Sequence, residues 1–124
     1  MPKEKIYYAH SKRSYDTRRE KSELRWLRKR YDVVDPNKDM GELGSREPYL
    51  QMVRTCGSVV CSEHNGHLTR GTYEEVYHAL VWGYPVLCIR RKGILRGFVL
   101  LKVIGLQIVD GRDYAGKYSR VHVE

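Results

Sequence analysis

The sequence contains few cysteines and no long apolar segment. Its three cysteines, Cys56, Cys61 and Cys88, are an odd number in apolar surroundings, which argues against a disulfide framework and favours a reducing compartment. No stretch reaches the roughly 18 apolar residues of a membrane-spanning helix, and the first residues lack the apolar core of a signal peptide. We therefore expect a cytoplasmic protein with no membrane partner.

Acidic residues are also in the minority, because 23 Lys and Arg stand against 15 Asp and Glu and give a formal net charge of +8 at pH 7. This excess favours anionic partners. Much of it falls in residues 12–30, where a basic run is typical of a solvated helix face. A basic nucleic-acid-binding module is one alternative. It is the less favoured one, since the chain has no helix-turn-helix, zinc-finger or RNP motif.

The chain is predicted to form a single domain spanning residues 1–124, because it has no repeat, linker or low-complexity tract. Apolar strand-like segments alternate with segments of helical period. Strands are expected at 5–10, 31–35, 57–62, 84–90 and 118–123, with one or two more in 98–109. Helices are expected at about 17–31 and 46–55, and from Gly71 to a cap near Gly83.

This alternation predicts an α/β fold in which a mainly parallel sheet lies between two helical layers. For a chain of this length we predict a three-layer, flavodoxin-like (Rossmann-like) fold with five strands in the order 2-1-3-4-5. Such folds bind ligands where the strand order reverses, here between the first and third strands. The loops at 10–16 and 63–70 meet there, which would bring Tyr7, His10 and Arg13 toward Glu75.

Glu75 stands in the first turn of the third predicted helix, and two interpretations of it are open. In the first, Thr72-x-x-Glu75 is a capping box, in which the glutamate bonds back to the Thr72 amide. The same pattern occurs at Thr17-x-x-Glu20, where we expect a helix cap and no chemistry. In the second, Glu75 is a catalytic carboxylate at the ligand-binding edge of the sheet.

Three segments occur in a recognisable order: Ile6-Tyr7-Tyr8-Ala9-His10, Val33-Val34-Asp35-Pro36, and Gly71-Thr72-x-x-Glu75-x-x-x-Ala79 followed by Gly83-Tyr84-Pro85-Val86. Together they resemble the nucleoside 2-deoxyribosyltransferase-like superfamily, which includes nucleotide N-glycosidases. The resemblance covers roughly the first 90 residues. It implies cleavage of the N-glycosidic bond of a nucleoside or nucleotide, by hydrolysis or by deoxyribosyl transfer.

The resemblance also implies roles for individual residues. Glu75 would attack the anomeric carbon to form a glycosyl-enzyme ester, and Tyr7 would hold it in place. The Gly71 and Thr72 amides, with Arg70 or Arg13, would bind a 5′-phosphate. The implied partners are a nucleoside or nucleotide substrate and further copies of this chain, because members of the family are oligomers.

The chain departs from the family pattern at several positions. An aspartate early in the third strand is missing, and Glu63 or His64 is the candidate to replace it as the acid. Arg70 stands where an acidic residue or serine is usual, and His10 replaces a glycine, so substrate contacts would differ. The missing aspartate supports the alternative of a non-catalytic protein that holds a nucleotide, or a nucleotide-derived signal, in the same crevice.

No metal or other cofactor is expected from the sequence. Cys56, Cys61, His64 and His67 lie within a dozen residues, but the two cysteines would point to opposite faces of a strand and lack the usual zinc-knuckle spacing. The apolar segment 98–109 is longer than a small monomer needs. We therefore expect a homodimer or a larger homo-oligomer.

Overall fold

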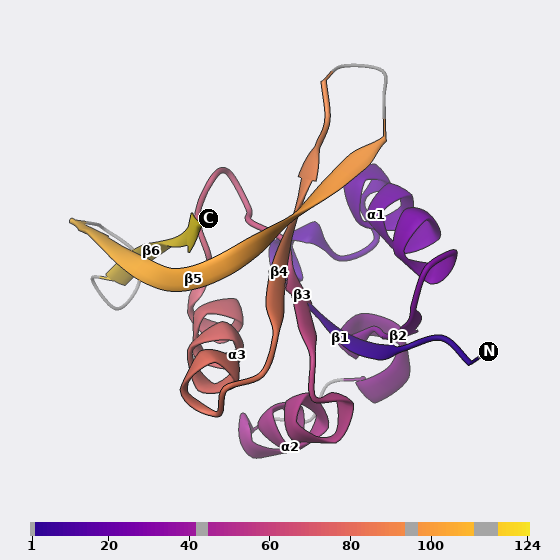
Figure 1. Ribbon diagram of the computed structural model, residues 1–124, viewed down its shortest axis with the longest axis horizontal. Helices are drawn as coiled ribbons and strands as arrows, with labels where there is room; N and C mark the ends of the chain where they lie inside the picture. Colours follow the sequence, from indigo (N-terminus) through magenta and orange to yellow (C-terminus); the bar gives the residue numbers. More distant parts are fainter. Residues whose placement is uncertain (1, 42–44, 94–96, 111–116) are drawn as a thin grey trace.

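Six strands form one mixed sheet in the computed structural model, which describes residues 2–41, 45–93, 97–110 and 117–124. The strands are β1 (Lys5–Ala9), β2 (Asp32–Val34), β3 (Val59–Cys61), β4 (Val86–Arg91), β5 (Phe98–Asp110) and β6 (Lys117–Val123). Their order across the sheet is β2-β1-β3-β4-β5-β6 (Figure 1). The first four strands are parallel, whereas β5 is antiparallel to β4 and to β6.

The α/β class and the predicted order of the first five strands are confirmed. The expected number of five strands is wrong, because the segment 117–123 pairs with β5 as a sixth strand. The flavodoxin-like pattern also ends at β4. Residues 92–97 are too few for the helical crossover that a parallel strand requires, so β5 returns antiparallel to β4.

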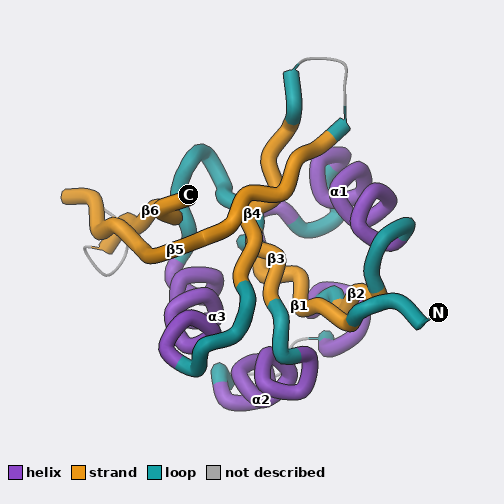
Figure 2. Tube along the Cα trace, viewed as in Figure 1, coloured by secondary structure: helices purple, strands orange, loops and turns teal. Residues whose placement is uncertain are grey.

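Three α-helices cover the two faces of the sheet (Figure 2): α1 (Arg18–Arg28), α2 (Glu47–Cys56) and α3 (Arg70–Val81). Two short helices, Lys12–Ser14 and Pro36–Met40, follow β1 and β2. On one face Leu27 of α1 packs with Tyr8. On the other, Val53 of α2 and Val76 of α3 pack with Tyr7. Because side chains alternate along a strand, the neighbouring tyrosines of β1 serve opposite layers.

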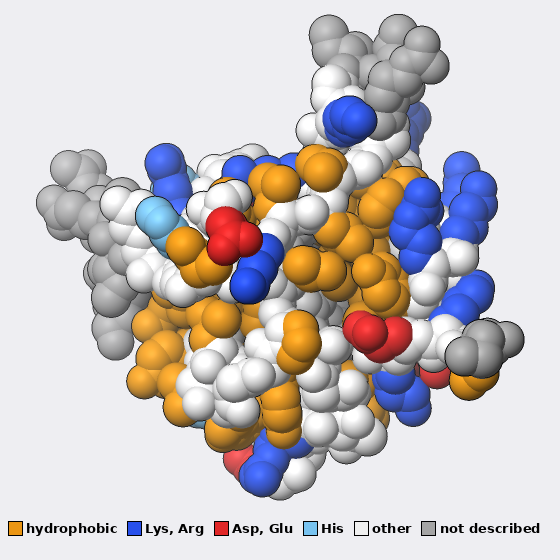
Figure 3. All heavy atoms as spheres, in the orientation of Figure 1, with side chains coloured by type: hydrophobic (Ala, Val, Ile, Leu, Met, Phe, Trp, Pro, Cys, Tyr) orange, Lys and Arg blue, Asp and Glu red, His pale blue; other side chains and the backbone are white. Residues whose placement is uncertain are grey.

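The ends of the helices follow their capping residues. Thr17 caps α1, as predicted, by accepting a hydrogen bond from the Glu20 amide. The helix ends at Arg28, earlier than the predicted Tyr31. Gly83 follows α3 with a φ of 79°, the left-handed conformation that suits glycine at this position. The basic residues of α1 are exposed, and Figure 3 shows Lys and Arg side chains gathered on that side of the molecule.

The C-terminal strand secures the loop that follows β3. The Leu68 amide donates to the Ser119 carbonyl at 2.8 Å, and Val121 belongs to the core that includes α3. Buried Ser119 and Val121 alternate with exposed Arg120 and His122, so the predicted half-exposed strand is confirmed. This pairing holds residues 63–69 next to the sheet.

The three cysteines are free thiols. Cys61 and Cys88 are opposite each other in the pairing of β3 with β4. Burial raises the pKa of the Cys56 thiol to about 11. Among the described helices, none is both long enough and apolar enough to cross a membrane.

Candidate active site

A cavity of about 530 Å³ lies at the carboxyl end of β1, beside the point between β1 and β3 where the strand order reverses. Residues 10–13 and Tyr15, which follow β1, form one wall. Residues 69–72 and Glu75, at the start of α3, form another. Pro36, Ser45, Arg46 and Tyr49 complete the lining. The reversal point therefore carries a cavity, as ligand-binding α/β folds do.

Glu75 lies in this cavity and is bonded to the first strand. The Tyr7 hydroxyl donates to Glu75 Oε2 at 2.5 Å, across 68 residues of sequence. Tyr7 is fully buried, and Glu75 is 7% exposed. One carboxylate oxygen is therefore fixed by a rigid strand, while the residue still contributes to the cavity wall.

The capping-box interpretation of Thr72-x-x-Glu75 is wrong. The helix begins at Arg70, so Thr72 lies inside its first turn and the capping position falls on Thr69, whose backbone is extended. The Glu75 carboxylate bonds to Tyr7. Glu75 therefore does not serve as a hydrogen-bond acceptor for the backbone amides at the start of α3. Its side chain is available to the cavity.

Burial raises the pKa of Glu75 from 4.5 to about 7. The hydrogen bond from Tyr7 and the charge of Arg46 favour the ionised form and oppose this rise, whereas neighbouring Glu74 adds to it. Burial, followed by the charge of Glu75, raises the pKa of Tyr7 well above its usual value. The phenol therefore stays protonated and acts as the donor.

Four cations surround the mouth of the cavity: Lys12, Arg13, Arg46 and Arg70. Arg46 Nε lies 3.0 Å from Glu74 Oε2, and Arg70 Nε lies 3.6 Å from Glu74 Oε1, so one carboxylate orients both guanidinium groups. The side chain of Thr69, the N-cap residue of α3, makes no capping hydrogen bond. The amides of Gly71 and Thr72 therefore add the positive end of a helix dipole to this cationic rim.

Arg46 is a lining residue that sequence reasoning missed. It precedes α2 and reaches across to α3, where a Cβ added at Gly71 would come within 2.7 Å of its Nη1 atom. The glycine thus leaves room for the guanidinium. The contact forms only because the start of α2 packs near the start of α3. The residues around Arg46 in the sequence therefore give no sign of it.

Of the other predicted site residues, His10, Arg13, Arg70, Gly71 and Thr72 line the cavity, whereas Glu63 and His64 are absent from its lining. Glu63 Oε1 lies 3.2 Å from Arg90 Nη2, and Glu63 Oε2 accepts from the Val121 amide at 3.4 Å.

His64 Nδ1 lies 3.4 Å from the Ser14 hydroxyl. Burial, with the charges of Arg13 and Arg19, lowers the pKa of His64. The geometry thus holds Glu63 on the β4 and β6 side of the sheet, and neither residue is placed beside Glu75.

The cavity combines one carboxylate with cationic and aromatic side chains, so it offers contacts to a ligand that carries a negative charge and a ring. Tyr15 and Tyr49 supply aromatic surface in the same cavity as Glu75 and the cations. No protein-family model, curated protein or solved structure matches this chain.

The shifted pKa of Glu75 predicts a pH-dependent stability. In the unfolded chain the carboxyl ionises near pH 4.5, but in the folded protein it keeps its proton to about pH 7. The native state therefore loses stability as the pH rises through this window, by up to about 3 kcal/mol. Glu75→Gln removes the loss and should raise the melting temperature at about pH 8, but far less at about pH 5.

Thermal unfolding followed by circular dichroism at both pH values measures this effect. Glu47→Gln, which changes an exposed glutamate of α2, is the control and should leave the pH dependence as it is. An equal gain from Glu75→Gln at both pH values would contradict the shifted pKa.

Proposed function

We propose that this protein cleaves the N-glycosidic bond of a nucleotide, with Glu75 as the nucleophile. The observation that carries the proposal is the hydrogen bond from Tyr7 to Glu75 in the wall of the cavity. It fixes a carboxylate that the helix does not use, at the sheet edge where such folds bind ligands. The resemblance to nucleoside 2-deoxyribosyltransferase-like proteins points to the same pair.

In the proposed reaction the ionised Glu75 attacks the anomeric carbon of the sugar. The bond to the base breaks, its electron pair leaves with the base, and a glycosyl ester forms on Glu75. A carboxylate suits this step because the transition state carries positive charge on the sugar ring. Water then hydrolyses the ester, or a second base accepts the sugar.

The cavity lining supports a phosphorylated substrate. The cationic rim and the uncapped start of α3 would bind a 5′-phosphate, as helix starts commonly do. Tyr15 and Tyr49 would stack on the base. The three free cysteines support a reducing compartment, for which the cytoplasm is our proposal.

The second candidate function is nucleotide binding without catalysis. Within the described residues, Glu75 is the one carboxylate that lines the cavity, so no second carboxyl is placed there to protonate the departing base. In that case the cavity would hold a nucleotide or a nucleotide-derived signal.

The proposal predicts release of free base from one or more members of a small substrate panel. The protein is incubated with deoxynucleosides, nucleoside monophosphates and NAD, and the free base is measured by chromatography. We expect monophosphates to be preferred over nucleosides. Glu75→Gln, which keeps an acceptor for Tyr7, should reduce release by at least about a thousandfold, because it removes the nucleophile.

The outcomes of this panel separate the candidates. Intact-mass measurement after an acid quench should show the glycosyl adduct on the wild-type chain but not on Glu75→Gln. Tight binding without release would favour the non-catalytic protein. Salt-dependent retention of DNA, with neither binding nor release, would favour the nucleic-acid-binding module.

Tyr7 should set the pH at which the enzyme becomes active. Tyr7→Phe removes a hydrogen bond that favours ionised Glu75, so the acidic limb of kcat/KM should move to higher pH by about one unit or more. Tyr8→Phe is the matched control. The Tyr8 hydroxyl bonds to buried Glu23 on the opposite face of the sheet. Tyr8→Phe should therefore affect stability without shifting the acidic limb of the kcat/KM profile. Equal shifts in both variants would count against the role of Tyr7.

We also propose that the chain forms a homodimer or a larger homo-oligomer. Large apolar side chains remain exposed on α3 and β5, namely Tyr77, Val81 and Ile104. Tyr77 and Val81 lie one helical turn apart on α3, so together they can contribute to a contact between subunits. Sedimentation equilibrium should therefore give a mass of at least two chains, and a monomer mass would contradict the proposal.

A further inference from the structure

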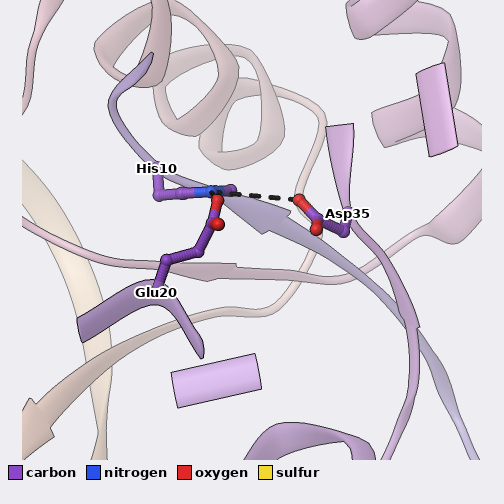
Figure 4. A group of neighbouring side chains, drawn as sticks. All are labelled: His10, Glu20 and Asp35. Atoms are coloured by element: carbon purple, nitrogen blue, oxygen red, sulfur yellow. Dashed lines mark hydrogen bonds and ion pairs between the residues drawn. The ribbon is translucent and has the colours of Figure 1, made fainter. Parts of the chain in front are cut away.

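Beside the cavity, which His10 also lines, three ionisable side chains from different elements meet in the interior. They are His10 after β1, Glu20 in α1 and Asp35 after β2 (Figure 4). His10 Nε2 lies 2.6 Å from Glu20 Oε2 and 3.9 Å from Asp35 Oδ1, and all three side chains are at most 1% exposed. Within the part of the chain that the structure describes, this is the one group of three or more potential metal ligands.

The orientation of the imidazole leaves one nitrogen facing the two carboxylates. His10 Nδ1 lies 3.0 Å from the Tyr8 carbonyl oxygen, which can only accept, so Nδ1 carries a proton. The other nitrogen, Nε2, points at Glu20 and Asp35. A lone pair on Nε2 would repel the carboxylate oxygens, so the contact requires a cation between these groups, either a proton or a metal ion.

A proton on His10 alone leaves the cluster unsatisfied. Asp35 Oδ1 accepts from the Asn37 amide at 3.0 Å, but Asp35 Oδ2 has no hydrogen-bond partner among the residues that the structure describes, although the side chain is fully buried. Buried polar atoms without partners are rare and costly in folded proteins. Asp35 is therefore a buried carboxylate whose acceptors are not all used, and its Oδ1 faces His10 Nε2.

We propose that His10, Glu20 and Asp35 bind a divalent transition-metal ion of the zinc type. With His10 neutral, the two carboxylates carry two negative charges, which a divalent ion balances. The ion would accept the Nε2 lone pair and bind one carboxylate oxygen each of Glu20 and Asp35, whose oxygens nearest to Nε2 are Oε2 and Oδ1. One imidazole with two carboxylates suits zinc and related ions better than Mg²⁺ or Ca²⁺, which prefer oxygen ligands throughout.

The surrounding hydrogen bonds have the form of an outer coordination shell. A metal-bound histidine usually donates its second N–H to a carbonyl, as His10 does to Tyr8. Glu20 accepts from the Asp16 amide at 2.8 Å and from Asn37 Nδ2 at 3.2 Å. These bonds hold the ligand side chains in place from outside the cluster.

The required rearrangement is small. Zinc bonds to nitrogen and oxygen are about 2.1 Å long, so neighbouring ligand atoms in a tetrahedral site lie about 3.4 Å apart. The three ligand atoms lie within 4.8 Å of one another. The proposal does not rest on the glycosidase function, because none of its three residues is the nucleophile or the tyrosine that holds it.

The test measures zinc bound by the whole chain. Because the ligands are buried, the protein is stripped with a chelator, unfolded, and refolded with one equivalent of Zn²⁺ or with EDTA before dialysis. We expect about one zinc per chain by mass spectrometry of the metal, and a higher melting temperature than with EDTA. Refolding with Co²⁺ should give the visible absorption of a site with nitrogen and oxygen ligands.

Two variants, Asp35→Asn and Glu20→Gln, test the proposed ligands. Asp16→Asn controls for a change of charge nearby, and Cys61→Ser and His67→Ala test whether zinc binds elsewhere. Asp35→Asn keeps the acceptor for the Asn37 amide and should weaken zinc binding at least about tenfold. Glu20→Gln serves the same purpose if the first variant does not fold. Asp16→Asn is the matched control, because Asp16 is exposed, has a φ of 62° that asparagine tolerates, and lies beside the cluster without facing the ion.

Zinc retained in wild type and in Asp16→Asn, but lost in Asp35→Asn or Glu20→Gln, supports the site. Three results would overturn it: no zinc retained after refolding, equal retention in every variant, or loss of zinc only in Cys61→Ser or His67→Ala.

Discussion

The hydrogen bond between Tyr7 and Glu75 is the constraint on which the candidate site depends. It joins β1 to α3, and a different part of the fold fixes each of the two residues. Tyr7 is fixed because β1 is paired on both sides by parallel strands. Glu75 is fixed because α3 packs on the same face of the sheet. The carboxylate is therefore held by the core of the protein and not by a surface loop.

A similar pair lies on the opposite face. Tyr8 donates to Glu23, which also accepts from Arg19 at 3.1 Å and from Ser62 at 3.1 Å. Glu23 thus accepts hydrogen bonds from three side chains, whereas among the described residues Glu75 has one donor, Tyr7, and lines the cavity. This difference separates a structural carboxylate from one that can react. Both pairs follow from the alternation of side chains along one strand.

The sequence predicted the fold better than it predicted the contacts within it. Apolar periods located the three α-helices and the strands of the described residues, but not the short helices at Lys12–Ser14 and Pro36–Met40. Thr17 and Gly83 marked helix ends as expected. The start of α3 was misjudged because Thr69 and Thr72 are both suitable caps, and only the extended backbone of Thr69 decides between them. The buried glutamates of α1 were also not foreseen, since their partners come from β1 and from loops.

The sequence by itself determined the α/β class, the order of the elements and the excess of positive charge, because these depend on local period and composition. Tertiary structure alone decided the partners of the ionisable groups. It placed Glu63 beside Arg90, Glu75 beside Tyr7, and His10 between Glu20 and Asp35. These pairs are distant in sequence, and each forms only when separate elements pack together. Apolar residues repeat with the period of a helix or a strand, but charged residues on distant segments do not. The sequence therefore does not reveal which charged residues will pair.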